Sequence, residues 1–202
     1  MSEIRVRFAP SPTGPLHMGG LRTALFNYLF AKKNNGAFLV RIEDTDKKRE
    51  VAGAEEYIFK SLDWCGMQVD ERSSDNSHRQ SSRKKVYQAK ARELIKKGLA
   101  YYAFDSEQEL QRLREEFLKR KETFMYNWKT RKKLKNSLTM NKEEVASLVR
   151  QGKPFVVRFL CPRDKKVNTN DLIRGKGSID SSLIDDKVLI KADGMPTYHF
   201  AN

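Results

Sequence analysis

Cysteine is scarce in this chain of 202 residues, which contains only Cys65 and Cys161. The two lie far apart in the sequence and neither belongs to a CxxC pair. The sequence therefore disfavours a disulfide framework and a cysteine-based zinc site. We expect both thiols to be small core residues in a reducing compartment.

Long apolar runs are missing as well. No segment approaches the roughly 20 apolar residues that a membrane-spanning helix needs. The first twenty residues also lack the apolar stretch of a signal peptide. We therefore expect a soluble, cytoplasmic protein.

Acidic residues are in deficit, because 26 Asp and Glu face 40 Lys and Arg and leave a formal net charge of +14. Such an excess favours a polyanionic partner, most often nucleic acid, although a basic solvated surface is an alternative explanation. The excess is concentrated in residues 112–135, where ten Lys and Arg face three Glu. This segment is the best candidate for phosphate contacts, with Tyr126 and Trp128 as candidates for stacking on bases.

The first 44 residues predict a strand, a loop, a helix and a second strand. EIRVRF alternates apolar and charged residues, as a strand does. The segment LRTALFNYLFAKKNNG predicts a helix whose inward stripe consists of Leu21, Leu25, Leu29, Phe26 and Phe30. AFLVRIED is a continuous apolar run, typical of a buried strand in a parallel sheet. This order predicts a βαβ unit with a right-handed crossover.

Further helices are predicted over residues 53–66, 79–98, 107–118 and 141–152. In the first of them Ile58, Leu62 and either Trp64 or Cys65 should point inward, and Asn141 should cap the last. Short strands are expected at residues 101–104, 154–162, 187–192 and 196–202. The middle third therefore has the pattern of an α+β insert, and because the chain ends inside an apolar element we expect a fragment of a longer protein.

The loop RFAPSPTGPLHMGG concentrates three prolines, three glycines and one histidine between the first strand and the first helix. Ligands bind at the carboxyl ends of parallel strands, and a helix start favours phosphate. The spacing fits neither G-x-G-x-x-G nor G-x-x-x-x-G-K-[ST], so the usual dinucleotide and P-loop motifs are excluded. His17 could hydrogen-bond a phosphate, or it could be satisfied by the backbone of its own loop.

The same loop resembles the HIGH signature of class I aminoacyl-tRNA synthetases, in the form used by glutamyl-tRNA synthetases. Further blocks match in the same order: RFAPSPTG, LFNYLFAKKNNGAFLVRIEDTD, GAEE and GMPTYHFAN. The signature positions are Pro10, Ser11, Pro12, Thr13, Gly14, Pro15, Leu16, His17, Met18, Gly19 and Gly20. The fourth position of the HIGH motif is Gly20 where the motif name has histidine, so one of the two signature histidines is absent.

The resemblance implies a fold, a reaction and a domain order. The fold is α/β, a Rossmann-like parallel sheet interrupted by an α+β connective insert. Residues 1–92 would form the first part of the catalytic domain, 93–190 the insert that binds the tRNA acceptor end, and 191–202 the return. The reaction would use ATP with Mg²⁺ to activate L-glutamate and would then transfer it to tRNA(Glu). The KMSKS-like loop and the anticodon-binding domain of the family are missing, so the chain alone should be inactive.

The resemblance also assigns residues to roles. In the family pattern His17 and Gly20 would face ATP, and His17 would be the catalytic group. Arg7 would pair with a substrate carboxylate, and Glu43 would accept the substrate ammonium group. The glutamate pocket as a whole would consist of Arg7, Ala9, Ser11, Glu43, Tyr198 and Asn202. Asp44 and Asp46 are expected to form turns, and His199 to be structural.

Some family members bind zinc through cysteines in the insert, but GLAYYAFDS and MYNWKTRKK contain none. We therefore expect no zinc, and we expect a monomer. YNWKTRKK also replaces the Tyr-Asp-Gly-Arg block of many relatives, which leaves the grip on the acceptor end less defined. Three alternatives remain: a stand-alone relative that glutamylates a tRNA base, a non-catalytic RNA-binding module, and a glutaminyl enzyme.

Overall fold

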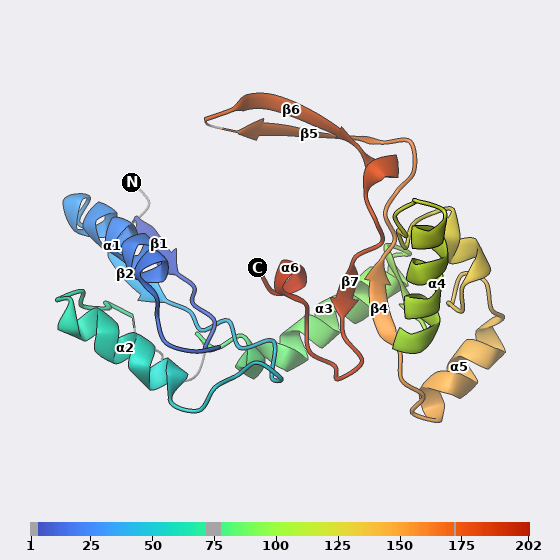
Figure 1. Cartoon of the computed structure of the whole chain (residues 1–202), viewed down its shortest axis with the longest axis horizontal. Helices are drawn as coiled ribbons and strands as arrows, with labels where there is room; N and C mark the ends of the chain where they lie inside the picture. The colour runs from blue at the N-terminus through green and yellow to red at the C-terminus, as the bar shows by residue number, and fades with distance from the viewer. Residues whose placement is uncertain (1–3, 72–77, 172) are drawn as a thin grey trace. The chain divides into compact units, whose positions relative to one another are not determined.

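The structure is a computed structural model, and it describes residues 4–71, 78–171 and 173–202. The chain divides into two compact units, which are described separately. The first runs to Val86 and includes Ala201 and Asn202, and the second is Tyr87–Phe200. Figure 1 labels the helices and strands along the chain.

The first unit begins with the predicted βαβ arrangement. Strands β1 (Arg5–Phe8) and β2 (Ala37–Val40) pair in parallel, with Arg5 opposite Ala37 and Phe8 opposite Val40. Helix α1 (Met18–Lys33) connects them, as the sequence predicts. Beyond β2, isolated parallel bridges join Leu39 to Glu71 and Ile42 to Arg79, so the sheet continues on that side. Helix α2 (Ala54–Trp64) completes the unit, and a 3-10 turn (Ser81–Arg83) leads towards α3.

The inward stripe predicted for α1 is wrong at every position except Leu21. Ala24 and Ala31 are the fully buried residues of this helix, and Leu21 and Tyr28 pack against the same core. The other four residues of the predicted stripe are exposed, namely Leu25, Phe26 (70%), Leu29 and Phe30. Residues 21, 24, 28 and 31 also follow helical spacing, and their small alanines let the helix approach the sheet closely. The apolar residues of this helix surround most of its circumference, so periodicity alone could not select the packed side.

Helix α2 resolves the choice between Trp64 and Cys65. Ile58 and Leu62 are buried as predicted, and Cys65 packs partly against the core. Trp64 is 87% exposed. Cys161 is buried in the second unit, and both cysteines are free thiols.

The second unit is built around an antiparallel sheet with the order β3-β4-β7, consistent with the predicted α+β character. Its strands are β3 (Ala100–Ala103), β4 (Val156–Phe159) and β7 (Val188–Ile190). Helices surround it, and Asn141 caps the last of them, as predicted. They are α3 (Lys84–Lys96), which starts in the first unit, α4 (Glu107–Lys119), the 3-10 turn Thr130–Lys133 and α5 (Lys142–Arg150).

Two further elements differ from the sequence-based expectation. Strands β5 (Lys166–Asp171) and β6 (Gly175–Asp180) form a hairpin that no pattern predicted, because both strands are exposed throughout and lack an apolar face. Figure 1 shows it projecting as a two-stranded ribbon. The expected strand at residues 196–202 is wrong as well, since Tyr198–Ala201 forms a short helix, α6. Within the described residues, no helix has the length and apolar character needed to cross a membrane.

Candidate active site

The loop between β1 and α1 encloses a cavity of about 400 Å³. Pro10 and Pro12 are buried, so the loop is held against the unit at both positions. The carbonyl oxygen of Pro10 accepts the backbone N–H of Glu43 (2.9 Å), which ties the loop to the end of β2. The cavity is lined by Phe8, Pro10, Ser11, Thr13, Gly14, Pro15, Leu16, His17, Gly20 and Ile58. It therefore gathers the predicted ATP residues, and it also includes Ser11 from the predicted glutamate set.

His17 caps the start of α1 with its own side chain. Its Nδ1 accepts the backbone N–H groups of Gly19 (3.1 Å) and Gly20 (3.4 Å). An accepting Nδ1 carries no proton, so the neutral ring places its N–H on Nε2. The sequence left open whether His17 binds the backbone of its own loop or a phosphate. The structure assigns the backbone bonds to Nδ1, and Nε2–H is the donor that could bind a phosphate.

Gly20 packs closely against the side chain of Leu16 in its own loop. A Cβ at this position would come within 2.7 Å of Cδ1 of Leu16. Such a contact is too close for any real pair of carbon atoms, so a larger residue would push Leu16 out of place. This close approach is a structural reason for glycine at the fourth signature position, beside the predicted role of leaving room for a nucleotide.

Glu43 follows β2 and is almost completely buried, with 4% of its surface exposed. Its Oε1 accepts two bonds from Arg41, at 2.9 Å from Nε and 2.6 Å from Nη2, and one from Nε2 of Gln80 at 3.3 Å. Its Oε2 is buried and has no hydrogen-bond partner among the described residues. Buried carboxylate oxygens are seldom left unpaired, so Oε2 is an acceptor that fits a ligand cation.

Two arginines converge on the side chain of Asn202. Nη2 of Arg7 donates to Oδ1 of Asn202 at 3.3 Å, and Nη2 of Arg41 donates to the same oxygen. Arg7 is exposed near the end of β1, and Ala9 follows directly after that strand. Paired guanidinium groups suit a carboxylate, so this corner of the first unit has the chemistry of an anion site beside the unpaired acceptor of Glu43.

Tyr198 and His199 belong to the second unit and lie on α6. Tyr198 is exposed, and its ring meets the ring of His199 edge-on at 5.7 Å. Both residues lie in a helix, where the sequence had predicted a strand.

Sequence reasoning missed Arg41 and Gln80 and underestimated Asp44. Asp44 is buried and accepts the backbone N–H (2.8 Å) and the hydroxyl (2.5 Å) of Ser81, so it anchors a distant segment, whereas we had expected it to form a turn. Asp46 fits the turn expectation, because its carbonyl oxygen accepts the N–H of Arg49.

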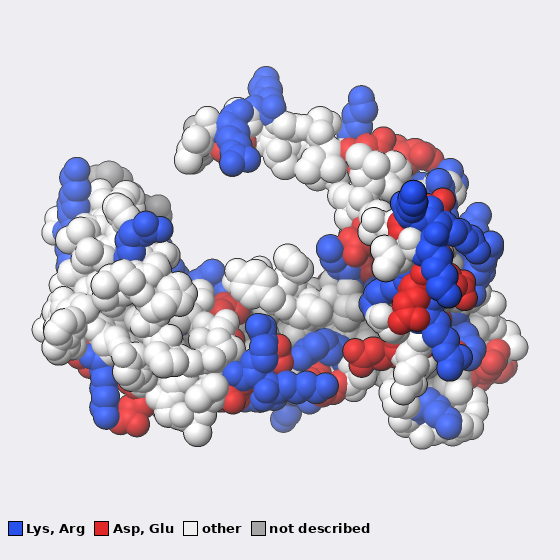
Figure 2. Space-filling view, viewed as in Figure 1, with Lys and Arg blue, Asp and Glu red and all other residues white. Residues whose placement is uncertain are grey.

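The basic segment 112–135 gives one correction. Tyr126 is 4% exposed, donates to Asp105 (2.8 Å), and has the guanidinium of Arg158 over its ring at 3.7 Å. Its faces are therefore not open to a base, and burial raises the pKa of its hydroxyl. Trp128 is half-buried, with the guanidinium of Arg163 at 3.5 Å from its ring centre. Figure 2 shows Lys and Arg side chains crowded over the part of the second unit that contains α4.

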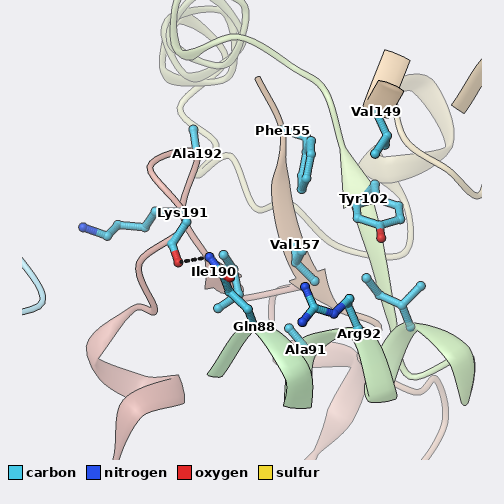
Figure 3. A pocket seen from close by; sticks show the side chains of 12 residues that line it. Gln88, Ala91, Arg92, Tyr102, Val149, Phe155, Val157, Ile190, Lys191 and Ala192 are labelled. Carbon is cyan, nitrogen blue, oxygen red and sulfur yellow. Dashed lines mark hydrogen bonds between the residues drawn. The ribbon is translucent and has the colours of Figure 1, made fainter. Parts of the chain in front are cut away.

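A second cavity, of about 310 Å³, lies within the second unit between α3 and the sheet (Figure 3). Aliphatic and aromatic side chains form most of its wall, with Arg92 and Tyr102 among the polar groups. At its edge Gln88 donates to the carbonyl oxygen of Gly194 at 3.1 Å. None of the predicted site residues lines this cavity. Across the described ranges there is also no group of three or more His, Cys, Asp and Glu arranged to hold a metal ion.

Residues 3–202 match the family described as tRNA synthetases class I (E and Q), catalytic domain. The chain belongs to this family. This class I synthetase chain is 53% identical over its whole length to the glutamate–tRNA ligase of Christiangramia forsetii. It is 52% identical to the glutamate–tRNA ligase of Porphyromonas gingivalis. It covers 41% and 40% of those proteins, respectively.

Solved structures agree with the sequence comparison. The chain matches the crystal structure of a glutamate tRNA ligase from Elizabethkingia meningosepticum in complex with its amino acid, with a TM-score of 0.93 and 51% identity. A second match is the glutamate-tRNA synthetase from Elizabethkingia anophelis, with a TM-score of 0.92. In both cases all of this class I synthetase chain is covered, but only 41% of the relative. The Rossmann-like fold class expected from the sequence is confirmed.

Proposed function

We propose that this chain carries the part of a glutamate–tRNA ligase that binds glutamate and ATP. The observation that carries the proposal is the buried, unpaired Oε2 of Glu43 close to the paired guanidinium groups of Arg7 and Arg41. An amino acid with two carboxylates presents one ammonium group and two anionic groups, which this combination complements. Relatives that are about 52% identical and bear the name glutamate–tRNA ligase support the same substrate.

The proposed reaction has two steps. A carboxylate oxygen of glutamate attacks the α-phosphorus of ATP, and the bond from that phosphorus to the oxygen bridging to the β-phosphate breaks, which releases pyrophosphate. A ribose hydroxyl at the end of tRNA then attacks the acyl carbon, and AMP leaves. Both steps depend on alignment and on stabilisation of negative charge.

The residues divide between these tasks. Nε2–H of His17 would donate to the phosphates, next to Gly20, in the cavity below the loop. Arg7, Ala9, Ser11, Glu43, Tyr198 and Asn202 would hold glutamate. We further propose that Mg²⁺ accompanies ATP, that residues 93–190 form the insert contacting the acceptor end, and that the protein acts as a cytoplasmic monomer.

The decisive experiment is glutamate-dependent exchange of pyrophosphate into ATP. It compares this chain with a long form, meaning a polypeptide that contains this chain and extends to the length of its relatives. We expect exchange by the long form and hardly any by the 202-residue chain, because the second family signature has no counterpart here. Exchange by the chain alone near the rate of the long form would refute the expected inactivity. If no amino acid supports pyrophosphate exchange by the long form, the proposed function is refuted and an RNA-binding module is favoured.

A further inference from the structure

The two oxygens of the Glu43 carboxylate are used unequally. Three donors reach Oε1, namely Nε and Nη2 of Arg41 and Nε2 of Gln80. No described group reaches Oε2. An arginine and a carboxylate usually prefer a fork in which each oxygen takes one N–H. In this site both Arg41 nitrogens bond a single oxygen, so a further constraint must hold the carboxylate in this orientation.

Gln80 supplies that constraint. Its side chain is completely buried, and its backbone N–H donates to the carbonyl oxygen of Ile42 (3.1 Å), the residue before Glu43. On the other side of Glu43, the carboxylate of Asp44 binds Ser81. The segment carrying Gln80 is therefore fastened to the segment carrying Glu43 on both sides, and the amide has little freedom to move away.

The same amide reaches the end of the chain. Nε2 of Gln80 also donates to the carbonyl oxygen of Ala201 at 3.3 Å. Ala201 precedes Asn202, whose side chain accepts from Arg7. An amide nitrogen has two N–H groups, so it can serve Glu43 and Ala201 together. The buried side chain of Gln80 thus connects Glu43, the proposed acceptor of the ammonium group, with the backbone next to Asn202. Asn202 in turn contacts Arg7, the arginine proposed to bind a carboxylate.

We propose that Gln80 is a positioning residue for the amino-acid substrate, an inference that rests on the proposed function. It holds Oε1 of Glu43 so that Arg41 cannot take both oxygens, and Oε2 remains for the substrate ammonium group. Through Ala201 it keeps Asn202 beside Arg7. Gln80 does not touch the substrate; it acts through these two residues.

The test uses Gln80→Met in the long form, measured by glutamate-dependent pyrophosphate exchange. Methionine has a similar length and no donor, so the KM for glutamate should rise about tenfold while the KM for ATP stays within about twofold. Gln80→Glu places a second carboxylate against Oε1 and should raise the KM for glutamate further. The matched control is Gln88→Met, which removes the same kind of bond to a backbone carbonyl in the second unit and should leave the KM for glutamate unchanged.

A double-mutant cycle with Glu43→Gln separates positioning from a general structural role. If Gln80 acts through Glu43, Gln80→Met should add little to the loss already caused by Glu43→Gln. The inference would be overturned if Gln80→Met caused the same loss of exchange in the unmodified and the Glu43→Gln long forms. It would also be overturned if Gln80→Met raised the KM for ATP as much as the KM for glutamate. Either result would leave the proposed function standing. If Gln80→Met does not fold, Gln80→Asn, which keeps the amide but cannot reach both acceptors, must show the same selective rise. Absence of glutamate-dependent exchange in the unmodified long form would instead defeat the proposed function.

Discussion

Two of the buried acidic residues, Glu43 in the first unit and Asp186 in the second, are hydrogen-bonded in opposite ways. Asp186 in the second unit is fully buried and accepts from the hydroxyl of Tyr101 (2.6 Å), from Nη1 of Arg131 (2.8 Å) and from the backbone N–H of Cys161 (3.1 Å). Both of its oxygens are paired. Glu43 in the first unit has three donors on one oxygen and, among the described residues, none on the other. A satisfied buried acid holds a fold together, whereas a half-satisfied one retains bonding capacity for a ligand.

Two buried nitrogens also lack a hydrogen-bond partner among the described residues, Nε of Arg79 and Nε of Arg158. Nε of Arg79 lies 3.4 Å from the carboxylate of Asp44, whereas Arg158 belongs to the second unit. Its guanidinium lies over the ring of Tyr126 and donates through Nη1 to the carbonyl oxygen of Asp186 (2.9 Å). The aromatic face therefore covers this cation and takes the place of a hydrogen-bond acceptor, whereas Oε2 of Glu43 has no such cover from a ring.

The largest effect should come from Asp186→Ala. It leaves the guanidinium of Arg131 and the hydroxyl of Tyr101 without their buried partner, so the free energy of unfolding should fall by about 3–5 kcal/mol. Urea denaturation of the chain measures this. Asp185→Ala is the control, because Asp185 pairs with Lys187 (3.0 Å) at the surface and should cost less than about 1 kcal/mol. Equal losses would mean that Asp186 is no more structural than its neighbour.

The next effect should come from Glu43→Gln in the long form. Replacement of the charged acceptor should lower kcat/KM for glutamate by about 100-fold or more, because the substrate ammonium group loses its buried counter-charge. Pyrophosphate exchange measures it, with the exposed Glu56→Gln, which loses only its pair with Lys60, as the control. An unchanged kcat/KM would make Glu43 a structural acid like Asp186.

Substitutions of His17 test a side chain with two proposed roles, one that stabilises the fold by capping α1 and one that binds a ligand. His17→Ala removes the cap of α1 and should destabilise the chain by about 1 kcal/mol, whereas His17→Asn keeps an oxygen acceptor for the cap and should recover most of it. Neither variant has Nε2–H, so both should lose about 100-fold in exchange by the long form. Thermal unfolding and exchange rates measure the two effects. Full activity in His17→Asn would reduce His17 to a cap.

The smallest predicted effect is a change in the pKa of Glu109, an exposed acid whose carboxylate is hydrogen-bonded. The bond from Lys135 (2.9 Å), together with bonds from Ser106, lowers the pKa of Glu109 from 4.5 to about 2. Because the folded-state pKa is lowered, the stabilisation is present above about pH 4.5 and is lost as the pH falls towards 2. Lys135→Met should raise the pKa of Glu109 towards its ordinary value in an NMR titration, and Lys133→Met should not. An unchanged value would assign the shift to Ser106.

Much of the fold could be predicted from local patterns, and the exceptions share a cause. The strand–loop–helix–strand order of the first unit and the capped helices follow from periodicity and cap residues such as Asn141. The packed side of α1 could not be predicted, because its apolar residues cover most of the circumference and only contact with the sheet selects Ala24 and Ala31. The β5–β6 hairpin carries no apolar face, and α6 is too short to have a periodic signal.

The candidate site also contains some residues that local sequence predicts and others that only the tertiary structure identifies. The loop motif and the resemblance it supports pointed to Arg7, Ser11, His17 and Glu43 without coordinates. Gln80 carries no local signal, because it lies 37 residues beyond Glu43 and its role arises only when the bridge beside Ile42 joins the two segments. Long-range pairing of this kind is decided by tertiary packing.

By itself, the sequence determined the βαβ start, the basic middle segment, the family and the identity of the loop residues, because each depends on neighbours in the chain. Only the tertiary structure decided which oxygen of Glu43 is paired, which nitrogen of His17 is used by the helix, and which side of α1 is buried. Those outcomes depend on donors and surfaces contributed by distant segments, and burial makes each of them costly to change.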